Sequence, residues 1–162
     1  KPINSQFFIS CRYVNTHALI SLLILSALLI NLTYVYHQNS FIMINYIFFI
    51  PSLIFGMFIF YSFEFMIASL SFWFRNFSYA GWLAGELLKY SRRPDSIYNQ
   101  WFRKTLFTIF PMAMICSAPS RILIFGLNLK LFFLQLFISI LFLWFTTLIW
   151  KAGLMQYESA SS

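Results

Sequence analysis

The sequence is short of charged residues, and of acidic residues above all. Only 9% of its 162 residues are charged, and Asp and Glu together number 4, whereas soluble domains average about 25% charged residues. So few charges cannot cover a water-facing surface, which excludes an ordinary soluble enzyme and a disordered tail. Two distant cysteines, Cys11 and Cys116, give neither a disulfide framework nor zinc spacing. An integral membrane protein is the class that remains.

Sequence motifs for catalysis are missing as well. There is no GxxxxGK[ST] loop for nucleotide phosphates and no GxSxG motif for a nucleophilic serine. His17 and His37 have no second ligand at metal spacing. We therefore predict a protein with no catalytic site, no metal and no cofactor. The net charge of +7 does not indicate nucleic acid, because basic residues of membrane proteins gather on the cytoplasmic side.

Long apolar runs are abundant. Hydrophobic residues make up 60% of the chain, and aromatic residues make up 22%. Since about 20 apolar residues cross a bilayer as a helix, four stretches qualify as spans: residues 17–36, 41–74, 105–119 and 131–150. The pattern predicts an all-α polytopic membrane helical bundle, with one transmembrane domain over residues 1–162.

Two of these spans carry further expectations. Residues 41–74 would measure about 51 Å as a straight helix, which exceeds a hydrocarbon core of about 30 Å, so we expect a kink at Pro51. Residues 131–150 end in Trp150 and Lys151, an aromatic residue and a cation that anchor a helix end at the interface.

The third span is interrupted by helix-breaking residues. Pro111, Pro119 and Gly126 fall within or just after it, together with the cation Arg121. Irregular backbone at membrane depth is tolerated only where protein or a water-filled cavity covers it. We therefore predict a span followed by an outer re-entrant element, in which Arg121 either lines a cavity or extends to the outer headgroups.

Residues 75–104 form the long polar connection. Apolar residues at positions 80, 83, 84, 87 and 88 recur at helical spacing, which predicts an interfacial helix on the cytoplasmic membrane surface. The loop either anchors the protein to anionic lipid or docks a soluble partner. The candidate docking residues are Lys89, Arg92, Arg93, Pro94, Tyr98, Trp101 and Arg103.

The cations also predict an orientation. With the N-terminus inside, nine of the eleven Lys and Arg residues lie in cytoplasmic segments, and only Arg121 and Lys130 lie outside. This bias favours cytoplasmic N- and C-terminal ends for the four spans. Glu64 then lies near the cytoplasmic boundary, where Arg75 is its candidate partner. The chain starts at Lys1 without a signal peptide, and we expect a longer protein with a further N-terminal part.

Several spaced motifs resemble the ABC-2 family of ABC transporter permeases. The resemblance covers residues 60–162 and comprises an FW pair, a P-x-x-I-Y segment, W-x-R, P-x-A, P-x-R-x-x-x-x-G and a final W-x-x-G-L-x-x-Y-x-S. Ser120 departs from the family pattern, which prefers Ala there, and Asn99 replaces a common Pro. The matching positions are Phe72, Trp73, Pro94, Ile97, Tyr98, Trp101, Arg103, Pro111, Ala113, Pro119, Arg121, Gly126, Trp150, Gly153, Leu154, Tyr157 and Ser159.

The resemblance implies a function and partners. A member of this family is a permease of six spans, so these four would be the last four, and we expect two further spans before them. It pairs with a second permease subunit and with ATP-binding subunits, and it is expected in a bacterial inner membrane as part of an exporter. The alternatives from other classes are a membrane scaffold or assembly protein and a lipid-modifying enzyme, and the lack of clustered His, Asp or Glu argues against the enzyme.

Overall fold

The computed structural model describes residues 6–8, 16–36, 43–74, 79–93 and 95–161, and every regular element in these ranges is helical. The predicted all-α membrane bundle is confirmed. The helices in chain order are α2 (Thr16–Tyr36), α3 (Met43–Ser69), η1 (Leu70–Phe72), α4 (Ala80–Leu88), η2 (Lys89–Arg92), η3 (Asp95–Ile97), α5 (Gln100–Thr108), α6 (Met112–Phe125) and α7 (Leu129–Ser161).

The chain divides into two units, residues 1–43 and residues 44–162. The first unit contains α2, which coincides with the predicted span 17–36 and is long and apolar enough to cross a membrane. Its sequence is apolar on all sides and carries no charged residue. Such a helix is suited to lipid or to the interior of a membrane bundle.

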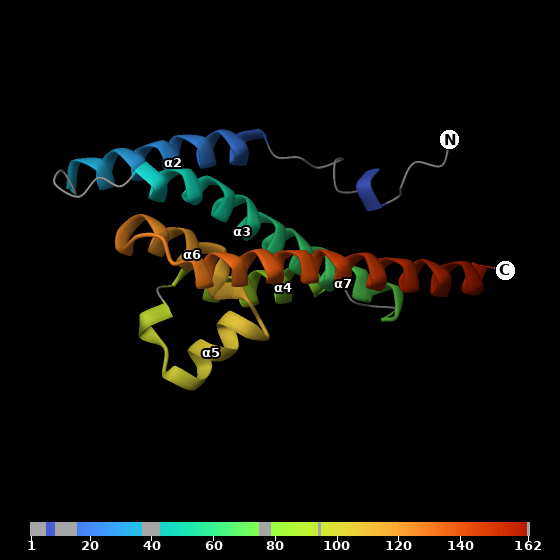
Figure 1. The fold of residues 1–162 in the computed structure, drawn as a ribbon. Helices are drawn as coiled ribbons and strands as arrows, with labels where there is room; N and C mark the ends of the chain where they lie inside the picture. Colours follow the sequence, from blue (N-terminus) through green and yellow to red (C-terminus); the bar gives the residue numbers. More distant parts are fainter. Residues whose placement is uncertain (1–5, 9–15, 37–42, 75–78, 94, 162) are drawn as a thin grey trace. The chain divides into compact units, whose positions relative to one another are not determined.

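In the second unit, α3 and α7 lie side by side and run in the same direction (Figure 1). Near their starts, Ser52 of α3 donates a hydrogen bond to Gln135 of α7 at 2.6 Å. About ten residues further along both helices, Thr146 donates to the Ser62 carbonyl at 3.3 Å. Both helices are long and apolar enough to span a bilayer. Because they are parallel, the chain between them must return to the end of the bundle where α3 begins.

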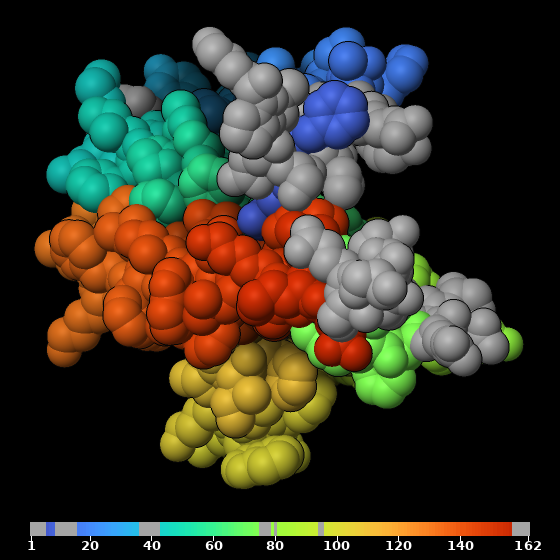
Figure 2. Space-filling model, turned by 90° about the vertical axis from the view of Figure 1, so that its right-hand side faces the viewer, coloured from blue at the N-terminus to red at the C-terminus, as the bar shows by residue number. Residues whose placement is uncertain are grey.

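The return is made in pieces. The predicted span 105–119 falls on α5 and α6, which meet at a bend of 95° over a break of three residues, 109–111, so this stretch is a bent helix pair and not one straight helix. Pro111 occupies the N-cap of α6, whereas Pro119 lies inside that helix without ending it. A proline is easily placed at a helix start, where its missing N–H has no partner to lose. In both views α5 projects from α6 and α7 (Figures 1 and 2).

A close helix crossing accommodates Pro119. Proline has no N–H to donate to the carbonyl four residues earlier, which here belongs to Ile115. That carbonyl oxygen faces Gly56 of α3, where a Cβ atom would lie only 2.7 Å from it. The absence of a side chain at Gly56 therefore lets α3 and α6 approach closely. Pro51 also lies within α3, and that helix continues through it to Ser69.

The last helix does not end at Trp150, where the sequence suggests a helix end. The α7 helix continues to Ser161, and the Trp150 side chain is only 9% exposed. Its ring packs on Phe65 and Phe72 of the α3–η1 segment, with centroids 5.1 Å apart in both pairs. One turn later, Gly153 gives the Phe72 ring room, because a Cβ there would lie 2.3 Å from a ring carbon. Trp150 thus packs against the α3–η1 segment and holds α7 to it.

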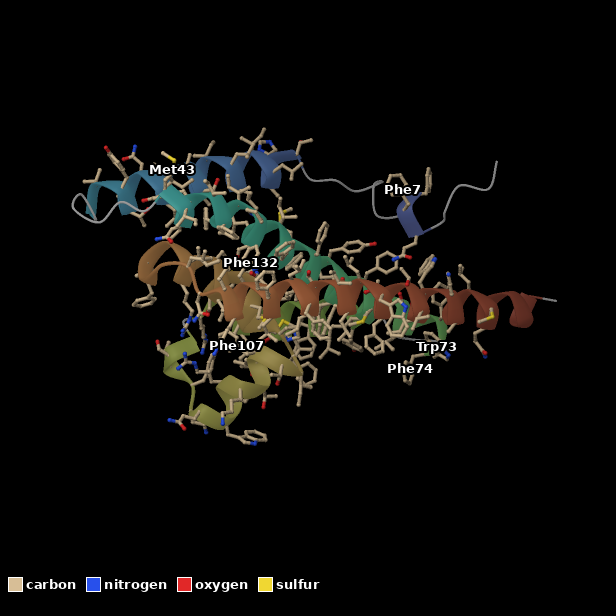
Figure 3. The ribbon with its side chains drawn as sticks, viewed as in Figure 1. Phe7, Met43, Trp73, Phe74, Phe107 and Phe132 are labelled. Carbon is tan, nitrogen blue, oxygen red and sulfur yellow. The ribbon has the colours of Figure 1, made fainter. Side chains whose placement is uncertain are left out.

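The α4 helix forms where the apolar pattern predicts it. Its apolar face packs on protein, because α3, α5 and α6 supply a complementary apolar surface within the same unit; its position at the membrane surface stays a prediction. This core consists of the buried residues Phe63, Ile67, Ala84, Leu88, Leu106, Met112 and Ala113. Figure 3 shows Phe107 where α5 approaches α6, and Phe132 between α3 and α7, within 5.0 Å of the Phe48 ring centroid.

Candidate functional site

A basic pocket lies where η2 and the residues after it meet α6. Its volume is about 390 Å³, and three arginines line it: Arg92, Arg93 and Arg121. The other lining residues are four serines, a cysteine and two large apolar residues: Ser91, Ser96, Ser117, Ser120, Cys116, Ile124 and Phe125. We call this cavity the arginine pocket.

Helical periodicity builds one wall of the arginine pocket. Ser117, Ser120, Arg121 and Ile124 stand at positions i, i+3, i+4 and i+7 of α6, so they share one face of that helix. An aromatic contact supports the charged member of this face, because the Arg121 guanidinium lies 5.9 Å from the centroid of the Phe107 ring. Such a cation–π contact stabilises a guanidinium that is removed from water.

The other wall follows from the end of the α4–η2 segment. Ser91 is buried, and its hydroxyl donates to the Leu88 carbonyl at 2.7 Å, which satisfies one carbonyl where the helix ends. Arg93 then leaves the helix in an extended conformation, with φ −96° and ψ 143°. The segment therefore turns beside α6 and brings Arg92 and Arg93 to the pocket. Pro94, which is predicted to end this helix, lies outside the described residues.

The far end of α6 places Arg121 beside a second cavity. That cavity has a volume of about 620 Å³ and is also lined by Gly126, Asn128 and Lys130. Gly126 has a φ of 89°, the one positive φ among the described residues. Asn45, near the start of α3, accepts a hydrogen bond from the Leu127 N–H at 3.0 Å. The turn from α6 to α7 thus lies at the end of the bundle where α3 begins.

The arginine pocket brings together residues that the charge count assigns to different sides of the membrane. That count assigns Arg92 and Arg93 to the cytoplasm and Arg121 to the outside, whereas the three side chains line one pocket in the structure. The packing of η2 on α6 brings them together. The side of the membrane on which each of them lies stays a prediction.

The remaining candidate residues are dispersed. Lys89 is exposed and pairs with Glu86, three residues earlier on the same helical turn. Tyr98 packs in a ring cluster with Tyr90 and Phe102. Trp101 is 75% exposed on α5, and Arg103 is half-buried on the same helix.

Three other predicted positions have different surroundings. Pro111 and Pro119 are both fully buried around α6. Glu64 is exposed on α3. Its predicted partner Arg75 lies outside the described residues. Of the residues proposed for the re-entrant element, Arg121 and Gly126 are thus the two that border a cavity.

A buried polar cluster joins the long helices, and the sequence patterns did not single it out. The Gln135 amide is fully buried; it accepts from Ser52 and donates to the carbonyls of Ser52 and Met114 at 2.9 and 3.0 Å. One side chain therefore connects α3, α6 and α7. A glutamine within an otherwise apolar span is the feature that could have predicted it, because polar side chains in membrane helices usually face another helix.

Among the described residues, no three His, Cys, Asp or Glu side chains lie close enough together to hold a metal ion. Long apolar helices, a broken helix pair and a basic pocket instead define a polytopic membrane protein with cavities between its helices.

Comparison with known proteins identifies the family. The model of the ABC-2 family transporter proteins matches residues 1–161, so the chain belongs to that family. It is a permease component of an ABC transporter and an integral membrane protein. No curated protein and no solved structure matches the chain.

Proposed function

We propose that this chain is the transmembrane permease subunit of an ATP-driven exporter, and that a separate ATP-binding subunit hydrolyses the ATP. The observation that carries the proposal is the family match over residues 1–161. The absence of a GxxxxGK[ST] loop from the sequence supports a division of labour between chains. The apolar helices provide the path, and the partner provides the energy.

The assembly contains a second permease subunit, either a copy of this chain or a homologue, in the inner membrane of a bacterium. We place the start of α3 on the outer side and the ends of α3 and α7 on the cytoplasmic side. The parallel arrangement of these helices is compatible with this orientation, and so is the exposed Lys151 on α7. The Ser62 region then lies nearer the cytoplasm than the Ser52 region.

Lys89 and Trp101 are exposed, and a large exposed aromatic ring is a common centre of a protein–protein interface, so we propose both as contacts with a protein partner in the assembly. Arg92 and Arg93 belong to the arginine pocket and are weaker docking candidates. We assign Arg121, Gly126, Pro111 and Pro119 to the element that reshapes the path, because they form and follow the 95° bend between α5 and α6.

The transport direction is tested with membrane vesicles that contain the full chain and its ATP-binding subunit. In inverted vesicles, external ATP reaches the cytoplasmic side, so an exporter moves a fluorescent amphiphile into the lumen. A non-hydrolysable ATP analogue is the control and should give no uptake. ATP-loaded right-side-out vesicles that accumulate the amphiphile, while inverted vesicles do not, would instead indicate an importer.

A further inference from the structure

A serine hydroxyl is buried without a hydrogen bond where α3 faces α7. Ser62 of α3 is fully buried, and its Oγ atom finds no hydrogen-bond partner among the described residues. A buried polar group without a partner loses its hydration and gains nothing in return, so such groups are rare in folded proteins. Other serines of α3 are satisfied: the Ser69 hydroxyl, for example, donates to the Phe65 carbonyl at 2.7 Å. Ser62 therefore requires an explanation of its own.

The hydroxyl on the facing helix already has an acceptor. Thr146 of α7 is also fully buried, and its Oγ1 atom lies 2.8 Å from the Phe142 carbonyl oxygen and 3.3 Å from the Ser62 carbonyl oxygen. One hydroxyl has one hydrogen to donate, and the shorter contact has the ordinary length of an O–H···O bond, whereas the longer one exceeds it. Thr146 thus donates mainly within α7, and its bond to Ser62 is weak.

The contact between α3 and α7 changes in character along its length. Near the helix starts, the Gln135 amide bonds Ser52 and the Met114 carbonyl at 2.6 to 3.0 Å. Hydrogen bonds are directional, so they fix the two helices relative to each other at that level. Beyond Ser62, the Trp150 ring packs on α3 and η1, and apolar contacts are not directional. A small displacement beyond the Gln135 level therefore breaks no strong hydrogen bond between α3 and α7.

We propose that α3 and α7 have a second packing state, in which the Ser62 hydroxyl donates to Thr146 Oγ1 while Thr146 donates to the Phe142 carbonyl. A hydroxyl oxygen has two lone pairs that accept hydrogen bonds, so this arrangement satisfies both hydroxyls. Thr146 Oγ1 lies 3.3 Å from the Ser62 carbonyl oxygen, and a small displacement of the helices is sufficient to bring the two hydroxyls together.

The two states differ by one hydrogen bond at the centre of the contact. Packed helix contacts change between discrete arrangements and do not deform continuously, and the Gln135 level is the fixed point of this change. The proposal does not depend on transport or on an ATP-binding partner, because every contact that carries it lies within residues 44–162.

The test is a spin-label distance measurement on the full chain in lipid nanodiscs, with the native cysteines replaced by serine. Ala68→Cys on α3 and Ala152→Cys on α7 carry the labels, because both positions are exposed and lie beyond Ser62 and Thr146 on their helices. Two distances between the labels are expected, one for each packing state.

Ser62→Ala should leave one distance, because it removes the donor of the additional hydrogen bond. Ser69→Ala is the matched control and should keep both distances, since the Ser69 hydroxyl bonds within α3. A second labelled pair, Ile50→Cys with Phe133→Cys, occupies exposed positions next to the Gln135 level and should give a single distance in every variant.

Thermal unfolding gives an independent measurement that needs no labels. Ser62→Ala should raise the unfolding midpoint by about 2–4 °C, because it removes an unpaired buried hydroxyl. An unchanged or lower midpoint would show that this hydroxyl is already bonded, and it would overturn the proposal. A distance distribution between Ala68→Cys and Ala152→Cys that Ser62→Ala leaves unchanged would overturn it as well.

Discussion

The contact between Gly56 and α6 gives a sharp quantitative prediction. In Gly56→Ala the new Cβ would lie 2.7 Å from the Ile115 carbonyl oxygen, and 3.4 Å from two further backbone atoms of that residue. An ordinary contact begins near 3.4 Å, so α3 and α6 must move about 0.7 Å apart. Backbone atoms cannot escape by changing rotamer. We therefore expect a cost of about 2–3 kcal/mol, within the range for overpacked cores.

Gly85→Ala is the matched control. Gly85 also lies within a helix, but a Cβ there meets nothing within 4 Å. Both substitutions gain the same helix propensity, about 1 kcal/mol, so the difference between them isolates the clash. Thermal unfolding of the full chain in detergent, followed by tryptophan fluorescence, should show a lower midpoint for Gly56→Ala and an unchanged or higher midpoint for Gly85→Ala. Equal midpoints would refute the close crossing of α3 and α6.

A double substitution examines the cause of the contact. In Pro119→Ala the new N–H can donate to the Ile115 carbonyl and draw it into the α6 hydrogen-bond ladder. The penalty of Gly56→Ala should then fall by about 1 kcal/mol in the Pro119→Ala background, a coupling typical of residues in one contact. A penalty that is independent of position 119 would mean that the proline does not direct this carbonyl.

Three further substitutions test the packing of the second unit, each by the same unfolding assay. Gln135→Leu should cost about 1–2 kcal/mol, because it removes the buried amide that joins three helices; the exposed Gln100→Leu should be neutral. Gly126→Ala should lower the free energy of unfolding by about 1–2 kcal/mol, because the φ of 89° at this position is strained for a residue with a Cβ. An unchanged stability would contradict the positive φ of this turn. Gly153→Ala should destabilise the folded chain, because the new Cβ would clash with the Phe72 ring. Phe72→Leu in the Gly153→Ala chain should restore part of the lost stability, and a double variant no more stable than Gly153→Ala would contradict this contact.

Hydropathy and helical periodicity predict the long helices and the existence of α4 correctly. The charge-free run at residues 17–36 and the repeat of Ala84 and Leu88 on one face are local properties, and local patterns report local structure. Local patterns do not show whether protein or lipid covers the apolar face of a helix. The α4 face could have met lipid or protein, and only the apolar side chains of Phe63, Ile67 and Met112 decide for protein.

Long-range contacts decide what the sequence leaves open. Two prolines mark residues 105–126, and the sequence alone does not say that Pro111 stands at a helix start while Pro119 is accommodated opposite Gly56. Trp150 is an aromatic residue beside a cation, as at a helix end, yet it lies inside α7 and packs on Phe65 and Phe72. The positive-inside count likewise treats residues 75–104 as one loop, whereas η2 packs on α6.

The arginine pocket shows the same limit at the candidate site. Arg92, Arg93 and Arg121 each stand out in the sequence as unusual charges, and the sequence leaves open whether Arg121 lines a cavity or extends to the headgroups; in the structure all three line one pocket. These side chains come together because the chain reverses direction between α4 and α6, and residue spacing does not predict that reversal. Arg92 and Arg93 lie almost 30 residues before Arg121 in the sequence, but the packing of η2 on α6 brings the three close in space.

Co-purification tests the central claim most directly. An affinity-tagged full-length chain, produced with its neighbouring genes and isolated in mild detergent, should bring with it a polypeptide that carries a GxxxxGK[ST] loop and hydrolyses ATP. The same complex should contain two permease subunits by mass. Recovery of the folded chain without any ATP-binding subunit, across several mild detergents, would contradict its assignment as the permease of an ATP-driven exporter.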